Sequence, residues 1–324
     1  VLKSLEQGRD VKESLIKRAV KRVVIVGMGY IAMEMADVLR ARGIAVDMVK
    51  PRSRLLPWLD EQLAAEVYQE LEKNRVGVYA GHEPKRIERT ASGLKCVCPD
   101  LELDGEMVLL AVGVKPNSEL AAAAGIELGA EGAVAIDGSM RTSHPDVYAA
   151  GDCAEARHLV TGRKAWFPLA LVANRGGRVA AENVTGGKAV LKGIVGTAVF
   201  KVFDLEVART GITVADAEKY GFEPASVTIT SQSKAHAHPG SWPILVHMVG
   251  DRLSGRLLGA QMVGREGAAH RINAPAVALH NKMQVSGFAE TDLAYAPPFG
   301  PVWDPTLIAA RQLLKKMQKD ESNG

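Results

Sequence analysis

The chain has 324 residues, of which 47% are hydrophobic and 24% charged, and its formal net charge at pH 7 is +3. This composition is typical of a folded globular protein, and the length allows two or three domains because single cores stop growing near about 250 residues. The 40 basic residues are interspersed with 37 acidic ones, so no nucleic-acid surface is expected. Without an apolar run of about 18 residues or a signal peptide, the chain is expected to be cytoplasmic and to have no membrane partner.

The first part of the chain alternates strands and helices in the order that a parallel sheet requires. Residues 23–26 form a continuous apolar run, which predicts a strand buried on both faces. A helix over residues 30–42 and a strand over 45–49 complete a βαβ unit. We expect the helix to bury one apolar stripe, formed by Ile31, Met35, Val38 and Leu39.

Further alternation predicts the rest of a Rossmann-type domain. The pattern favours an amphipathic helix over 60–74, a short strand at 77–79, a small meander over 84–104 and a buried strand over 107–112. A domain crossing is expected in the Ala/Gly-rich stretch that follows, and then a helix over 169–184.

From residue 193 onward the sequence pattern predicts mainly strands and turns, with helices at 214–220 and 266–282. This pattern predicts an α+β domain with a largely antiparallel sheet. Its expected strands lie at 197–203, 206–209, 227–230, 244–249 and 256–263.

The sequence Gly27-Met28-Gly29-Tyr30-Ile31-Ala32 is a G-x-G-x-x-A fingerprint between a strand and a helix. In such a turn Gly27 permits the sharp bend, Gly29 lets a pyrophosphate approach the backbone, and the start of the helix supplies amide donors. The fingerprint alone would be weak evidence, but its place inside a βαβ unit predicts a dinucleotide site.

The end of the second strand bears on which dinucleotide binds. A site that prefers NAD places a carboxylate there, whereas this chain has Lys50, followed by Arg52 and Arg54. Because cations attract a 2′-phosphate, we expect NADPH preference or dual use. A solvated basic loop that tolerates NADH is the alternative.

Four stretches together resemble the pyridine nucleotide-disulfide oxidoreductases, in particular the branch of NADH oxidases and coenzyme A-disulfide or persulfide reductases. They are GMGYIAMEMADVLRARG at 27–43, AVGVKPNSEL at 111–120, TSHPDVYAAGD at 142–152 and LAYAPPFGPVWDP at 293–305. The resemblance covers the chain from about residue 15 onward.

The resemblance implies an NAD(P)-binding domain inserted in a FAD-binding domain, followed by an α+β dimerisation domain. We expect a connecting segment at 1–18, the NAD(P) domain at 19–113, the second FAD-binding segment at 114–191 and the dimerisation domain at 192–324. A first flavin segment of about 100–150 residues, which would carry its own glycine fingerprint and the active-site cysteine, is expected to be absent from this chain.

By the same resemblance, Gly27, Gly29 and Ile31 would line the NAD(P) pyrophosphate, and Gly113 would lie near the cofactor. Lys50 and Arg52 stay the candidates for its 2′-phosphate.

Tyr30 resembles the aromatic residue that covers the flavin and moves when nicotinamide enters, and Glu34 would approach the carboxamide. Asp152 would bond the flavin ribityl chain, and the helix that starts near Leu169 and Ala170 would point its amides at the flavin. Packing at a helix start, surface exposure, and for Asp152 a capping role are the alternatives.

Tyr295 lies in a loop that in this family reaches the neighbouring subunit, where it could act as an acid toward a thiol leaving group, so a homodimer is expected. Phe299 stands where many relatives have a second tyrosine, which puts a two-tyrosine mechanism in doubt. A packing role for Tyr295 is the alternative.

The cysteines and histidines suggest neither a disulfide framework nor a metal site. Cys96 and Cys98 alternate in a predicted strand, an unfavourable geometry for a disulfide, and Cys153 is expected to pack as a small apolar residue. His236 and His238 lie in a predicted loop or hairpin, without the further ligands that zinc needs.

The resemblance predicts an enzyme that uses FAD and NADP or NAD to reduce a small disulfide, a persulfide or oxygen. Without the first flavin segment, the chain by itself is expected to be redox-incompetent. The alternative is a non-catalytic module that binds NAD(P) and dimerises.

Overall fold

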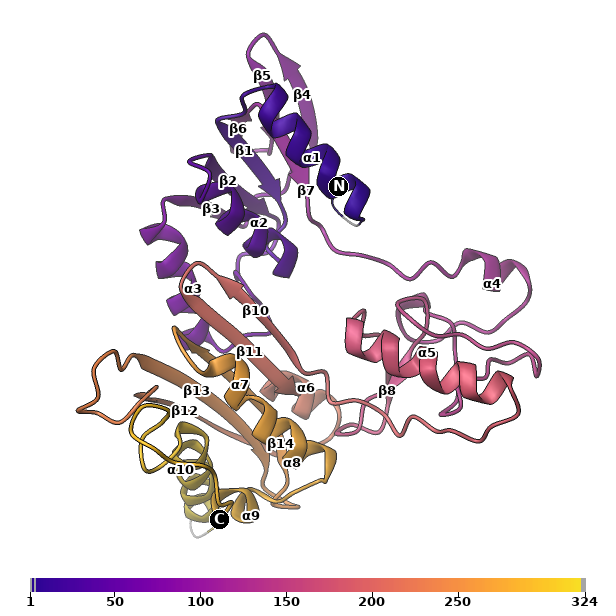
Figure 1. The fold of residues 1–324 in the computed structure, drawn as a ribbon, viewed down its shortest axis with the longest axis vertical. Coiled ribbons are helices and arrows are strands. Elements are labelled where there is room, and N and C mark those ends of the chain that lie inside the picture. The colour runs from indigo at the N-terminus through magenta and orange to yellow at the C-terminus, as the bar shows by residue number, and fades with distance from the viewer. Residues whose placement is uncertain (1, 3, 322–324) are drawn as a thin grey trace.

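The computed structural model describes residue 2 and residues 4–321, which form a mixed α/β protein with three parts (Figure 1). The nucleotide-domain part is a parallel sheet of order β3-β2-β1-β7 with helices α1, α2 and α3. A three-stranded antiparallel sheet, β4-β5-β6, adjoins it where the meander was expected. The elements are α1 (Leu5–Lys17), β1 (Arg22–Val26), α2 (Tyr30–Arg40), β2 (Ala45–Lys50), α3 (Glu61–Lys73), β3 (Val76–Ala80), β4 (Arg86–Thr90), β5 (Gly93–Val97), β6 (Glu102–Gly105) and β7 (Met107–Leu110).

The buried face of α2 differs from the stripe expected from the sequence. Leu39 is buried and Met35 is half-buried, but Ile31 and Val38 are 38% and 45% exposed, so the expectation is wrong for these two. The fully buried positions include the small residues Ala32 and Ala36. Ala32, Met33, Ala36 and Leu39 recur at the i+3 and i+4 spacing of one helix face, and Ile31 and Val38 fall outside this face.

The middle part, drawn in magenta and pink at the right of Figure 1, has a small core of its own. Its elements are α4 (Glu119–Ala123), a short 3-10 turn (Ala130–Gly132), β8 (Ala156–Arg157), β9 (Lys164–Ala165) and α5 (Ala170–Val184). Val134, Ile136 and Met140 are buried beneath α5, and Gly176 of that helix faces Met140 and Ala150. The helix expected over 169–184 is thus present.

The C-terminal domain is built on a five-stranded antiparallel sheet of order β10-β11-β14-β13-β12, which confirms the α+β prediction. All eight residues of the central strand β14 are buried. The helix expected over 266–282 is two shorter helices that meet at Ile272. The elements are β10 (Ala198–Val202), β11 (Leu205–Gly211), α6 (Val214–Lys219), β12 (Pro224–Gln232), β13 (Pro243–Asp251), β14 (Leu257–Gly264), α7 (Ala268–Arg271), α8 (Asn273–His280), α9 (Val285–Ala289) and α10 (Pro305–Glu321).

The nucleotide-domain part and the C-terminal domain share one hydrophobic core. Phe200, Val207 and Val263 of the antiparallel sheet belong to the same buried cluster as Ile25 of β1 and Leu63 of α3. Burying a side chain of this size stabilises a protein by about 1.5–3 kcal/mol. The two sheets are therefore held together by core packing.

Polar contacts fix the same junction. Gln261 of β14 donates to the carbonyl of Trp58 (2.8 Å) and accepts from the amide of Asp60 (2.7 Å). The Asp60 carboxylate lies 3.3 Å from Nδ1 of the buried His247, which also contacts the Thr228 hydroxyl at 2.9 Å. Burial lowers the pKa of His247, although the Asp60 charge opposes this. The segment 58–60 is thus bonded to two strands of the other domain.

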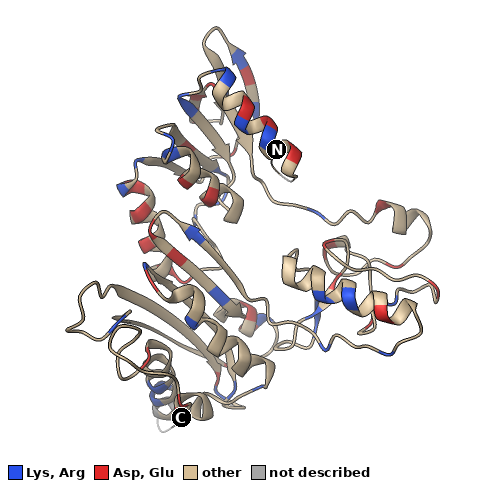
Figure 2. Ribbon diagram, viewed as in Figure 1, with Lys and Arg blue, Asp and Glu red and all other residues tan. Residues whose placement is uncertain are grey.

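Positive and negative residues are spread over all three parts, without a stripe of one sign on the face drawn in Figure 2. Among the described helices, none combines the length and the apolar character needed to cross a membrane.

Replacing Gln261 with Met should lower the free energy of unfolding by about 2 kcal/mol, because the Trp58 carbonyl and the Asp60 amide lose their partner while the side-chain volume stays similar. Urea unfolding followed by circular dichroism measures this change. Gln69→Met, at an exposed position of α3, is the matched control and should leave the midpoint unchanged. Equal midpoints for the two variants would contradict the role of Gln261.

Candidate functional site

The turn between β1 and α2 can be made only with glycine at position 27. Gly27 has a φ of +117°, and a Cβ at this position would lie 2.2 Å from the carbonyl oxygen of Ala111, at the end of the neighbouring strand β7. The amide of Gly27 donates to the carbonyl of Val49 on β2. The first glycine of the fingerprint is therefore fixed by close packing between three parallel strands.

Gly29 stands in different surroundings. It is exposed, and a Cβ added to it would meet no atom within 4 Å. It caps α2 without a side-chain hydrogen bond, and among the described residues none accepts from the amides of Tyr30 and Ile31. Free amides and the positive end of a helix dipole, next to open space, are what a phosphate group requires.

The other residues expected near this nucleotide surround the same sheet edge. Ile31 and Glu34 are exposed on the first turns of α2. Gly113 is exposed just beyond β7, with a φ of +100° and open space at its Cβ. The structure thus brings the predicted residues to the carboxyl ends of β1 and β7, where ligands bind in open α/β sheets.

The basic residues of the loop after β2 differ in their surroundings. Lys50 is buried, and its ammonium group donates to the carbonyl of Leu55 at 2.6 Å. Burial, and then the charge of Arg52, lowers the pKa of Lys50. Arg54 contacts the Leu59 carbonyl and Glu61. The Arg52 side chain is exposed and has no hydrogen bond or ion pair within the described part of the chain. Lys50 shapes the loop, and Arg52 is available to a ligand.

Tyr30, the fourth residue of the fingerprint, packs between two aromatic rings. Its ring centroid lies 5.7 Å from that of Trp58, in an edge-to-face arrangement, and 5.0 Å from that of Phe200 on β10. The guanidinium of Arg209 lies 4.9 Å from the Trp58 ring. Trp58, Phe200 and Arg209 are not among the residues predicted from the sequence, because no local pattern signals that residues so far apart along the chain converge.

In the middle part, Asp152 is bonded to the segment that leads into α5. The indole of Trp166 donates to the carbonyl of Asp152 at 2.8 Å, while the Asp152 carboxylate is exposed and accepts no hydrogen bond from a described residue. Leu169 caps α5 without a side-chain hydrogen bond. The free carboxylate can accept from hydroxyl groups, and the uncapped helix end can bond an acceptor.

A polar pocket of about 420 Å³ lies behind the loop that carries Tyr295. Arg271 crosses it and bonds the Asp304 side chain at 2.9 Å and the carbonyls of Phe299 and Ser233 at 2.7 and 2.9 Å. Tyr295 and Phe299 are 49% and 80% exposed, so the loop is held from behind while its aromatic residues face outward. No sequence motif identified Arg271 as the anchor.

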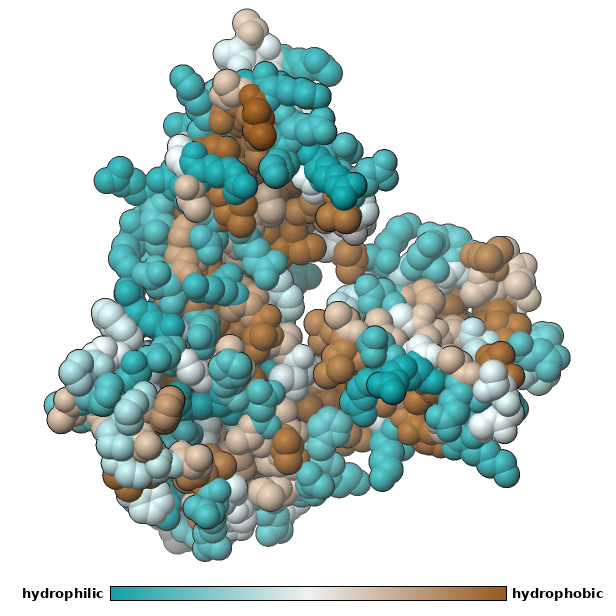
Figure 3. Space-filling model, in the orientation of Figure 1, coloured by the Kyte–Doolittle hydropathy of each residue, from teal (hydrophilic) through white to brown (hydrophobic). Residues whose placement is uncertain are grey.

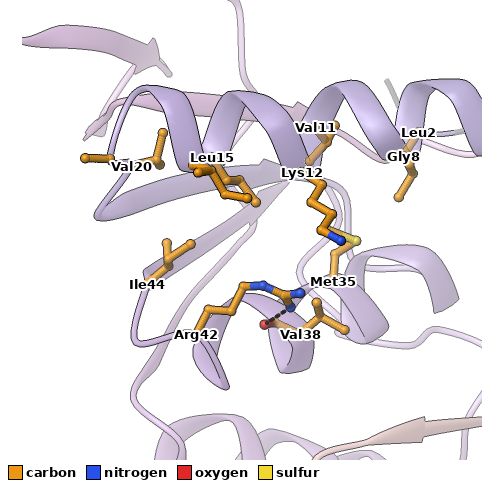
Figure 4. Close-up of a pocket in the computed structure, with 12 residues that line it drawn as sticks. Leu2, Gly8, Val11, Lys12, Leu15, Val20, Met35, Val38, Arg42 and Ile44 are labelled. Atoms are coloured by element: carbon orange, nitrogen blue, oxygen red, sulfur yellow. Dashed lines mark hydrogen bonds between the residues drawn. The ribbon is translucent and has the colours of Figure 1, made fainter.

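An apolar groove of about 690 Å³ lies away from the fingerprint, between α1 and α2 (Figure 4). Val11 and Leu15 of α1 face Met35 and Val38, which belong to the middle and end of α2 rather than to its start. Apolar areas over the α1–α2 region and over α5 are visible on the molecular surface in Figure 3. The groove is thus separate from the glycine turn.

The three cysteines are free. Cys96 and Cys98 are buried, and burial raises the pKa of both thiols. Cys153 donates from Sγ to the carbonyl of Ala150. Among the described residues, no group of three or more His, Cys, Asp or Glu side chains could hold a metal ion.

Comparisons with known proteins agree with this arrangement. The family model described as pyridine nucleotide-disulphide oxidoreductase matches residues 1–177, and the model of that family's dimerisation domain matches residues 197–305. The chain is similar to an NAD(P)H coenzyme A polysulfide/persulfide reductase of Pyrococcus horikoshii, with 39% identity over 94% of this chain and 68% of the relative. It is also similar to an NADH oxidase of Methanocaldococcus jannaschii, with 34% identity over 98% of this chain and 70% of the relative.

The solved structure of an NAD-dependent persulfide reductase from A. fulgidus matches with a TM-score of 0.93 and 35% identity, over 98% of this chain and 59% of that protein. The chain therefore spans 59% to 70% of the length of these relatives.

The two glycines of the turn should respond differently to a methyl group. Gly27→Ala is expected to lower the free energy of unfolding by about 2 kcal/mol or more, because the backbone is left-handed and Ala111 blocks the Cβ. Gly29→Ala should cost less than about 1 kcal/mol, the difference between Gly and Ala as a helix cap. Thermal unfolding compares the two, and an equal loss would contradict the packing argument.

Proposed function

The chain belongs to the family of pyridine nucleotide-disulphide oxidoreductases, and we propose that it serves an enzyme that passes hydride from NAD(P)H to FAD and reduces a small disulfide, a persulfide or oxygen. FAD and NAD(P)H are the cofactors of this family. The acceptors correspond to the names of the relatives, a coenzyme A polysulfide/persulfide reductase and an NADH oxidase.

The observation that carries the proposal is the pair of glycines at the start of α2. Gly27 makes a turn that any side chain would block, and Gly29 leaves the helix amides open to a ligand. In the proposed complex the NAD(P) pyrophosphate lies on these amides, between Gly29, Ile31 and Gly113. Tyr30 and Glu34, one turn apart on α2, then lie toward the nicotinamide end.

The residues of the middle part fit the second cofactor. The Asp152 carboxylate would accept hydrogen bonds from ribityl hydroxyls, since no described residue occupies it. The start of α5, at Leu169 and Ala170, would direct amide donors and a positive dipole end at the flavin ring. Bound FAD supplies the capacity to accept a hydride and pass electrons onward.

We assign the acceptor side to the loop that carries Tyr295. The dimerisation-domain match supports a homodimer, and the outward position of Tyr295 suits a residue that serves a partner subunit. A phenol can protonate a departing thiolate when it is placed within hydrogen-bond reach. With Phe299 in place of a second hydroxyl, Tyr295 is the proton donor that this loop offers.

We infer that residues 1–324 alone bind NAD(P)H but do not turn over. The pKa values of the Cys96 and Cys98 thiols are raised by burial, and Cys153 is bonded to Ala150, so none of the three is suited to attack a disulfide. These observations favour, as second candidate, an NAD(P)-binding and dimerising module without catalysis.

Calorimetric titration of the purified chain with NADPH, together with its visible spectrum, tests this proposal. We expect one nucleotide per chain, no flavin absorbance and no oxidation of NADPH by a small disulfide. Absence of nucleotide binding would contradict the site at Gly29. Yellow protein that oxidises NADPH would contradict the inference that these residues do not turn over.

Arg52→Gln should weaken NADPH binding about tenfold and leave the affinity for NADH unchanged, because one charge-assisted bond to the 2′-phosphate is lost. The dissociation constants for both nucleotides measure the effect. Arg89→Gln, at an exposed position of β4, is the control and should change neither constant. Equal weakening of NADPH and NADH binding, or a preference of the wild-type protein for NADH, would contradict the assignment of Arg52 to the 2′-phosphate.

A further inference from the structure

The surroundings of Tyr30 belong mostly to the C-terminal domain rather than to its own. Phe200 on β10 packs at 5.0 Å with its ring inclined by 31° to that of Tyr30, and Arg209 comes from β11. Trp58 belongs to the nucleotide-domain part and meets Tyr30 edge-on, at an interplanar angle of 80°. Trp58 and Phe200 also contact each other edge-to-face at 6.4 Å.

Trp58 itself is fixed by the C-terminal domain. Its carbonyl accepts from Gln261, and Asp60, two residues later, is bonded to both Gln261 and His247. The Arg209 guanidinium lies over the indole ring, 4.9 Å from its centroid. A cation over an indole ring contributes about 0.5–2 kcal/mol, depending on how far it is desolvated.

Arg209 also acts on Tyr30 directly. Burial raises the pKa of Tyr30, and the charge of Arg209 and a hydrogen bond with it oppose that rise. The same helix is tied down by Asp37, whose carboxylate accepts from the amide of Phe203 at the β10–β11 turn, at 3.1 Å. Helix α2 is therefore anchored to the β10–β11 hairpin at its first residue, Tyr30, and again near its end, at Asp37.

We propose that Trp58, Phe200 and Arg209 form a clamp that holds Tyr30 in the position seen here, so that the nicotinamide ring must displace Tyr30 against this clamp. The proposal rests on the proposed function, in which Tyr30 stands at the nicotinamide site. The three are positioning residues, because they act through Tyr30 and not on the cofactor. The C-terminal domain thereby sets the affinity of the nucleotide domain for nicotinamide.

Because the clamp opposes entry of the nicotinamide ring, weakening the clamp should tighten the binding of NADPH. Arg209→Gln removes the charge over the indole and should lower the dissociation constant of NADPH about threefold. Arg209→Lys keeps the charge without the planar stack and should lie between wild type and Arg209→Gln. A residue that only stabilised the fold would weaken binding when replaced.

The experiment measures dissociation constants for NADPH and for 2′-phospho-ADP-ribose, which has no nicotinamide ring. The proposal expects Arg209→Gln to tighten NADPH alone and to have no effect in a Tyr30→Ala background, where no ring remains to be displaced. Arg311→Gln is the matched control, since Arg311 stacks on Trp303 at 3.7 Å in the same domain. Unfolding midpoints establish that each variant is folded.

Unchanged or weaker NADPH binding by folded Arg209→Gln would overturn the clamp while leaving the nucleotide site intact. An equal effect on both ligands would also overturn it, because the adenosine end does not meet Tyr30. If the wild-type protein bound neither ligand, this result would contradict the proposed function and, with it, the clamp.

Discussion

The packing of the nucleotide-domain part on the antiparallel sheet is the constraint on which the rest of the structure depends. Phe200, Val207 and Val263 enter the core of the parallel sheet, and Gln261 bonds the segment before α3 at two backbone groups. Trp58, in the loop after β2, and the ring of Tyr30 both pack against this junction. Their positions are set jointly by both domains.

The nucleotide end of the site separates structural from ligand-binding roles among residues of the same type. Gly27 is required by the backbone of Ala111, whereas Gly29 faces open space. Likewise the ammonium group of Lys50 donates to the Leu55 carbonyl, whereas the guanidinium of Arg52 is exposed. In each pair, one residue builds the site and we assign the other to the ligand.

The periodic signals in the sequence predicted the fold class and the glycine turn, because these depend on local patterns of buried and small residues. The prediction of the buried face of α2 was partly wrong, because Ala32 and Ala36 are fully buried while Ile31 and Val38 are exposed. The internal bond of Lys50 could not be foreseen either, because it depends on the path of the following loop. Phe200 and Arg209 lie too far from Tyr30 along the chain for any local pattern to join them.

We propose that a nicotinamide dinucleotide binds at the start of α2 with its reactive ring against Tyr30. A crystal structure of the protein in complex with NADPH would show whether this is so. We expect the pyrophosphate on the amides that follow Gly29 and the nicotinamide ring in contact with a displaced Tyr30. A nucleotide bound instead in the α1–α2 groove, or one that leaves Tyr30 between Trp58 and Phe200, would contradict it.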